Sequence, residues 1–152
     1  MLLAERFGMY YIDKDGQKKL PYIIHRTSIG CYERTLALLI EKYAGAFPVW
    51  LAPVQIKLLP IADRHLDYVY EIKKQLEANG ILRVEVDDRS EKLGYKLREA
   101  QLEKVPYMLV VGDKDIENNT VSVRSRKEGD KGAMAIDKFI KAVKEEIDTK
   151  RI

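Results

Sequence analysis

The sequence predicts an α/β fold, in which a mixed β-sheet with helices packed on it is preceded by a β-hairpin and one helix. From Val54 onward, strand-like apolar runs alternate with segments whose apolar residues recur at helical spacing. The run Tyr107–Val111 is almost wholly apolar, which is typical of a central strand buried on both faces. Residues 44–53 contain two prolines and no charge, so a boundary is expected there.

A hairpin is expected near the N-terminus. Tyr10–Ile12 and Tyr22–Ile24 are short apolar runs that flank a polar stretch with an Asp15-Gly16 pair, which is a hairpin signal. Pro21 would stand at the start of the second strand, where a missing N–H is tolerated.

A helix is predicted over Tyr32–Tyr43, ended by Ala44-Gly45. A hairpin and one helix cannot bury a core of their own. Leu36, Leu39 and Ile40 are therefore expected to expose apolar surface, and self-association of the chain is a hypothesis.

Seven elements are expected after the boundary. In chain order they are a strand at Val54–Leu59, a helix from Asp63 as N-cap to Ala78, a strand at Ile81–Val86 in which Leu82, Val84 and Val86 alternate with charged residues, a helix at Lys92–Glu103, a strand at Tyr107–Val111, a strand at Val121–Arg126, and a helix at Ala135–Asp148. Asn79-Gly80 is a typical helix stop.

Composition excludes several classes of protein. No apolar run is long enough to span a bilayer, and the N-terminus lacks the apolar segment of a secretory signal. The lone Cys31 cannot form an internal disulfide, so a cytoplasmic protein is expected. The net charge of +3 is only mildly basic and favours nucleic-acid binding weakly.

Few residues could hold a metal or perform covalent chemistry. The histidines are His25 and His65, with no metal-binding spacing and no glycine-rich phosphate loop, so the chain alone is expected to be catalytically incomplete. His65 is expected to be a surface residue near a helix start. In the segment from His25 to Arg34, Gly30 permits close backbone approach and Arg34 suits a phosphate or a purine, although Glu33 and Arg34 could equally be solvated charges.

A second group of charges lies in the α/β part. Arg89, Lys92, Lys96 and Arg98 gather at the start of a predicted helix, and helical spacing is expected to put Lys92 and Lys96 on one face beside Tyr95. Arg124 and Arg126 share a face of their strand. Taken alone, these residues could also form a solvated face.

The segment Ile24–Leu36 resembles motif 3 of class II aminoacyl-tRNA synthetases, a strand-to-helix segment with Gly-x-x-Glu-Arg. The flanks resemble the threonyl-tRNA synthetase family in particular, in the stretches Glu41–Pro48, Trp50–Gln55, Arg89–Lys96, Val105–Met108, Gly112–Lys114 and Val123–Arg126. The resemblance covers nearly the whole chain. It implies a class II catalytic-domain remnant with motif 3 at residues 1–45, a linker at 46–51, and an anticodon-binding domain at 52–152.

The resemblance also implies roles for individual residues. Arg34 would contact ATP, His25 would be one of three protein ligands to zinc, and Cys31 stands near the active site where serine is common. Arg124 and Asp115 would face the guanine of the anticodon, and Ser90 would lie near its uracil. Arg89, Lys92 and Lys96 would complete the anticodon-binding surface. These residues are the candidate site.

The implied function is anticodon recognition within a threonine–tRNA ligase, which attaches threonine to its tRNA at the expense of ATP. The implied partner is the anticodon loop of threonine tRNA. Binding to DNA or to a membrane is not expected. ATP and Zn would be cofactors of a full-length, homodimeric enzyme, and none is expected to bind this fragment. The alternative is a stand-alone RNA-binding or accessory protein with the same fold and no ligase activity.

Overall fold

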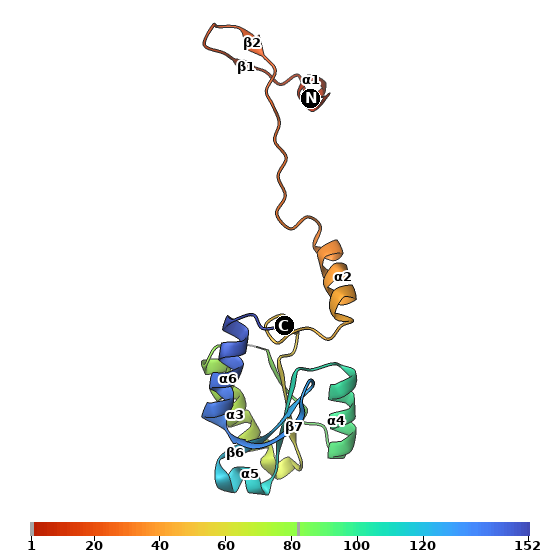
Figure 1. Cartoon of the computed structure of the whole chain (residues 1–152), viewed down its shortest axis with the longest axis vertical. Helices are drawn as coiled ribbons and strands as arrows, with labels where there is room; N and C mark the ends of the chain where they lie inside the picture. The colour runs from red at the N-terminus through yellow and green to blue at the C-terminus, as the bar shows by residue number, and fades with distance from the viewer. Residues whose placement is uncertain (1, 82) are drawn as a thin grey trace. The chain divides into compact units, whose positions relative to one another are not determined.

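The structure is a computed structural model that describes residues 2–81 and 83–152. The chain divides into two compact units, residues 1–37 and residues 38–152. The first unit contains the short helix α1 (Leu2–Arg6) and a two-stranded antiparallel sheet of β1 (Tyr11–Ile12) and β2 (Lys18–Lys19) (Figure 1). Helix α2 (Tyr32–Tyr43) spans the division between the units, and its bounds agree with the prediction.

The predicted hairpin exists, but its second strand comes earlier than expected. The amide of Gly16 donates to the carbonyl of Asp13 at 2.8 Å, which closes a tight turn and brings Lys18–Lys19 opposite Tyr11–Ile12. The prediction of a strand at Tyr22–Ile24 is wrong. After the tight turn, β1 pairs with Lys18–Lys19, which come earlier in the chain than that apolar run.

Apolar side chains of the first unit and of α2 remain in contact with solvent, as predicted from the small size of this part. Leu36 is 54% exposed and Ile40 is 48% exposed, whereas Leu39 is half-buried. Tyr22 and Ile24 are more exposed still, at 82% and 89%. The first unit therefore has no closed core of its own.

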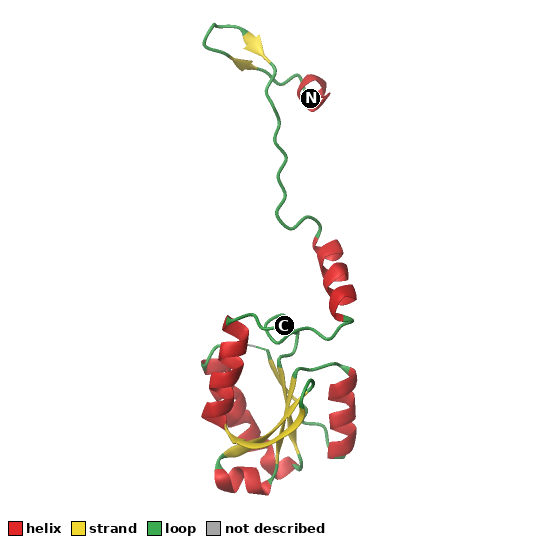
Figure 2. Ribbon diagram, viewed as in Figure 1, coloured by secondary structure: helices red, strands yellow, loops and turns green. Residues whose placement is uncertain are grey.

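The second unit is built on a five-stranded sheet with the strand order β4-β3-β5-β6-β7 (Figure 2). Its elements are β3 (Ile56–Pro60), the 3-10 turn η1 (Asp63–His65), α3 (Leu66–Ala78), β4 (Val84–Val86), α4 (Leu93–Leu102), β5 (Tyr107–Val111), α5 (Asp113–Asn118), β6 (Thr120–Ser125), β7 (Gly129–Ala135) and α6 (Ile136–Asp148). β3 runs parallel to β4 and β5, while β6 is antiparallel to both β5 and β7. The mixed α/β fold expected from the sequence is confirmed.

The sheet is covered differently on its two faces. Helices α3 and α6 pack on one face and α4 packs on the other (Figure 1). The larger core lies under α3 and α6, and it includes Ile56 and Leu58 of β3, Leu109 and Val111 of β5, and Phe139 of α6. The smaller core under α4 contains Leu59, Ala100 and Met108. β5 is the middle strand of the sheet and contributes to both cores, as its apolar sequence predicted.

Several predicted elements need correction. The first strand of the sheet starts two residues later than Val54 and ends at Pro60, and the second is a strand only at Val84–Val86, while Leu82 lies outside the described residues. Asp63 does not cap α3, because it is the first residue of η1. Helix α5 and strand β7 were not predicted. α5 has only six residues and β7 is rich in glycine and alanine, so neither carries a recognisable apolar periodicity.

Cationic side chains hold the chain between α2 and the sheet. The guanidinium of Arg126 donates to the carbonyls of Ala46 at 3.1 Å and Phe47 at 2.7 Å, and Arg83 donates to those of Trp50 and Ala52. Ala46, Phe47 and Trp50 belong to the predicted linker 46–51, so these hydrogen bonds fix the linker against the second unit. Arg126 follows β6 and is committed to this role.

No helix among the described residues combines the length and the apolar character needed to cross a bilayer.

The packing of α6 leads to a stability prediction. Phe139 is 2% exposed and its ring meets that of Tyr107 edge-on, with centroids 5.5 Å apart. Phe139→Ala should lower the free energy of unfolding by about 3–5 kcal/mol, since it leaves a cavity in the larger core. Leu102→Ala, at a residue that is 72% exposed, should change it by less than about 0.5 kcal/mol. Urea unfolding followed by circular dichroism measures both, and equal effects would contradict the described packing of α6.

Candidate nucleic-acid interface

The carboxyl ends of three parallel strands meet at one edge of the sheet. Three segments leave this edge: the loop 87–92 after β4, residues 61–65 with η1 after β3, and residues 112–115 with the first turn of α5 after β5. Ligands of open α/β sheets commonly bind outside such strand ends, because the loops there can be varied without disturbing the sheet. Ser90, Lys92 and Asp115 of the candidate site lie in or next to these loops.

Lys96 is buried beneath this edge, contrary to expectation. Its side chain is on α4, but the residue is only 3% exposed, and its ammonium group donates to the carbonyls of Asp87 at 3.0 Å and Pro60 at 3.4 Å. Lys92 is exposed, so the two lysines do not present a common face. Lys96 instead ties the ends of β3 and β4 together, and its ammonium is not offered to a ligand at the surface.

Arg89 is exposed, yet its charge is already paired. Its guanidinium donates to both carboxylate oxygens of Asp87, at 2.8 and 2.6 Å, and forms an ion pair with Glu99 at 2.6 Å. The Arg89 guanidinium holds the pKa of the buried Asp87 carboxyl below its ordinary value. It also lies 5.9 Å from the ring centroid of Tyr95, which is 48% exposed. Arg89 therefore shapes the loop after β4 and lies over one face of the Tyr95 ring, which stays half-exposed.

Ser90 and Lys92 lie in the same loop with exposed side chains. Lys92 is the N-cap residue of α4 and has extended backbone there. Within residues 2–81 and 83–152, no ion pair or hydrogen bond engages the Lys92 ammonium, so this charge is available at the start of a helix, where the backbone N–H groups also favour anions.

Asp115, in the first turn of α5, is held by hydrogen bonds beside strand β6. The residue is 7% exposed, and its carboxylate accepts from the backbone N–H of Gly112 at 3.0 Å and from the hydroxyl of Ser122 at 3.0 Å. The hydroxyl of Thr120 lies 3.4 Å away. The bond between Asp115 and Ser122 joins a predicted residue of the candidate site to one that was not predicted.

Arg124 follows Ser122 on the same face of β6, because side chains repeat every two residues along a strand. Its partner on β5 is Met108, so this face is the one that α4 covers over β3 and β5. Arg124 is 36% exposed, and its nearest acidic oxygen, on Asp130, is 3.8 Å away. A cavity of about 410 Å³ opens beside it, lined by Gln101, Val105, Met108, Arg124, Ser125, Arg126, Gly129 and Asp130.

Asp115 of α5 and Ser122 and Arg124 of β6 thus form a row on one face of the sheet. Asp115 contacts Ser122, and Arg124 follows Ser122 by two residues, which is about 6.7 Å along a strand. The spacing of the sequence predicts that Arg124 and Arg126 share a face, but it cannot reveal the Asp115–Ser122 contact, because the two residues come from different elements.

The start of α5 is anchored by a second polar group that the sequence did not predict. The ring of His65 is 1% exposed, and its Nε2 atom lies 3.0 Å from the Asp113 carboxylate. Arg64 donates to the same carboxylate through two nitrogens, at 2.9 and 2.5 Å. The bond from Arg64 is the larger cause of a pKa for Asp113 well below its ordinary value. The expectation of a surface histidine is wrong, because η1 turns the ring inward.

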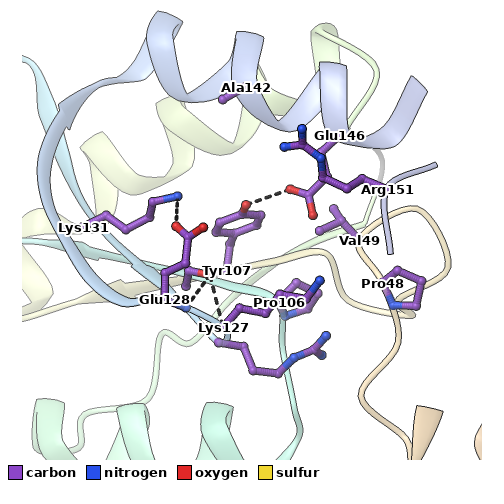
Figure 3. A pocket seen from close by; sticks show the side chains of 12 residues that line it. Pro48, Val49, Pro106, Tyr107, Lys127, Glu128, Lys131, Ala142, Glu146 and Arg151 are labelled. Atoms are coloured by element: carbon purple, nitrogen blue, oxygen red, sulfur yellow. Dashed lines mark hydrogen bonds and ion pairs between the residues drawn. The ribbon is translucent and has the colours of Figure 1, made fainter. Parts of the chain in front are cut away.

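A second cavity, of about 210 Å³, lies on the α6 side of the sheet (Figure 3). Both of its carboxylates have partners there, since Glu128 forms an ion pair with Lys131 at 2.5 Å and Glu146 accepts a hydrogen bond from the hydroxyl of Tyr107 at 2.7 Å. Burial raises the pKa of the Tyr107 hydroxyl. None of the predicted site residues lines this cavity.

The predicted residues of the catalytic remnant lie in the first unit. His25, Cys31 and Arg34 are all exposed. The thiol of Cys31 donates to the Glu33 carboxylate at 2.6 Å, and Thr35 donates to the carbonyl of Ile29 at 3.0 Å. Among the described residues, no three His, Cys, Asp or Glu side chains gather as a metal site would require. His25 could thus be only one ligand of a zinc site completed by other residues.

Comparison with known proteins gives a consistent result. The profile of the family described as "Anticodon binding domain" matches residues 49–146. The chain is 64% identical over 145 residues to the threonine–tRNA ligase of Clostridium perfringens and 58% identical over 148 residues to that of Acetivibrio thermocellus. These alignments cover 95% and 97% of the chain, but only 22% and 23% of the two relatives.

A solved structure is also similar. The RNA binding domain of threonyl-tRNA synthetase from Cryptosporidium parvum superimposes with a TM-score of 0.75 at 30% identity. The match covers 94% of the chain and 36% of that structure. Because the family profile alone matches more than half of the residues, the chain belongs to the family of anticodon-binding domains, in the form that is closely similar to those of threonine–tRNA ligases.

Proposed function

We propose that this chain recognises the anticodon of threonine tRNA as part of a threonine–tRNA ligase. The observation that carries the proposal is the row of Asp115 from α5 with Ser122 and Arg124 from β6, within the matched residues. The chain spans about a fifth of the length of its curated relatives, so joining threonine to tRNA with ATP would belong to a larger enzyme.

In this proposal, the row reads the guanine of the anticodon. Arg124 donates to the O6 and N7 acceptors of the base, as arginine commonly does with guanine. Asp115 accepts from the Watson–Crick donors on the opposite edge of a base that is splayed out of its loop. The preorganised Asp115 carboxylate supports this role, because Gly112 and Ser122 hold it in place before any RNA arrives.

The loop after β4 then contacts the neighbouring nucleotides. Ser90 lies near the uracil, Tyr95 offers a ring on which a base can stack, and Lys92 meets a phosphate. Arg89 stays paired with Asp87 and Glu99 and supports the loop. We leave Lys96 out of the contact surface, because its ammonium is buried.

The first unit would contribute to the catalytic domain of the complete enzyme. There, Arg34 would contact ATP, His25 would supply one zinc ligand, and Cys31 would lie near the active site. We expect that enzyme to be a cytoplasmic homodimer, and the 152-residue chain alone to be inactive in aminoacylation.

Guanine reading by Arg124 can be tested with anticodon stem-loops. The wild-type chain should prefer a loop whose triplet ends in GU over one with adenine in place of the guanine. Arg124→Ala should weaken binding to the GU loop by about 1–3 kcal/mol and reduce this preference. Filter-binding titrations at moderate salt measure both. Equal binding of the wild-type chain to the two loops would leave a general RNA-binding protein, and an unchanged preference in the variant would refute the role of Arg124.

The role of Lys92 makes a different prediction. Lys92→Ala should weaken binding to all loops alike, and should lower the slope of log K against log salt by about 1, because one phosphate contact is lost. The matched control is Lys74→Ala, which removes an exposed lysine of α3. A variant slope equal to that of the control would argue against a phosphate contact at Lys92.

A further inference from the structure

The buried His65 ring connects the segment after β3 to the segment after β5, because each of its two nitrogens has a hydrogen-bond partner. Nδ1 lies 3.2 Å from the backbone nitrogen of Ala62, which can only donate, so Nδ1 accepts. Nε2 must then carry the proton of the neutral ring, and it donates to the Asp113 carboxylate at 3.0 Å. One ring therefore caps η1 and simultaneously holds the first residue of α5.

Helix α5 depends on such contacts because it is short. It has six residues and ends at Asn119, which adopts a left-handed conformation with φ of 53°. A helix of this length is not stable by itself in water. Its N-terminal side lies tight against the loop after β3, where a Cβ added to Gly112 would come within 2.7 Å of Ile61 Cδ1.

The same short helix carries Asp115 in its first turn. Asp113 and Asp115 are two residues apart, and the N–H of Gly112, which precedes the helix, donates to the Asp115 carboxylate. Any displacement at Asp113 therefore reaches Asp115 and its 3.0 Å contact with Ser122.

We infer that His65 is a positioning residue for guanine recognition, because it holds α5, and with it the Asp115 carboxylate, against Ser122 on β6, two residues before Arg124. The inference rests on the proposed function. His65 itself has no access to RNA, since it is 1% exposed. It acts through Asp113, to which the exposed Arg64 donates two further hydrogen bonds.

Two substitutions separate the two bonds of the ring. The side chain of His65→Asn keeps an acceptor for the Ala62 N–H but is too short to reach Asp113. His65→Gln is long enough to donate to Asp113, and glutamine is a favoured residue at this capping position. Lys74→Ala serves as a surface control on α3.

The test uses the 152-residue chain and three anticodon stem-loops, with guanosine, inosine or adenosine at the central position. Inosine lacks only the N2 amino group, so the ratio of guanosine to inosine affinity reports the carboxylate. We expect His65→Asn to lower this ratio by about tenfold or to unity, and His65→Gln to restore most of it. Hydrogen exchange at the α5 amides should rise in the asparagine variant alone, while the salt dependence stays unchanged.

The outcomes distinguish the inference from the function on which it rests. If the wild-type chain prefers guanosine and His65→Asn keeps that preference, the inference is overturned and the proposed function stands. A parallel loss of affinity for all three loops, with the ratio intact, would show a purely structural role and also overturn the inference. If the wild-type chain binds the three loops equally, the proposed function fails and the inference fails with it.

Discussion

The edge of the sheet where β3 and β4 end depends on a buried ammonium group, that of Lys96. Lys96 reaches from α4 to the carbonyls that end β3 and β4, and hydrogen bonds to those carbonyls offset the cost of removing the charge from water. Without it, the carbonyls of Pro60 and Asp87 would lose this donor beneath α4. The loops after these strands leave from fixed points as a result, so Ser90 and Lys92 project from a rigid base.

The charges near this edge divide into those that build it and those that are free to act. Lys96 is bonded to backbone carbonyls and Arg89 to carboxylates, so both residues stabilise the shape of the surface. Lys92 and Arg124 keep exposed donors with weak or no partners among the described residues. The modest net charge of +3 is consistent with this division, because recognition by a few placed groups needs little overall positive potential.

The sequence predicts the apolar part of the fold well, and the polar part poorly. Helices α2, α4 and α6 and the central strand β5 were predicted correctly, because the pattern that indicates each of them lies within its own segment of the sequence. The strand at Tyr22–Ile24 was wrongly predicted, because a turn close to β1 pairs that strand with Lys18–Lys19 instead. Asp115 and Arg124 were identified by resemblance, but the burial of Lys96 and His65 was not, since both depend on carbonyls and carboxylates from distant parts of the chain.

Strand β6 shows why residue type alone does not assign a role. Arg124 and Arg126 are two residues apart, and strand periodicity gives them the same expected direction. Arg126 lies just beyond the last residue of the strand, and its guanidinium turns to the carbonyls of Ala46 and Phe47. Burial there lowers the pKa of Arg126, although the group stays charged. Both arginines line the cavity of about 410 Å³, but the half-exposed Arg124 donates to no backbone carbonyl among the described residues. Arg126 therefore fixes the chain that leads into the sheet, through the carbonyls of Ala46 and Phe47. Arg124, two residues earlier, is paired only weakly with Asp130 among the described residues, so two neighbouring arginines at the end of one strand have different structural roles.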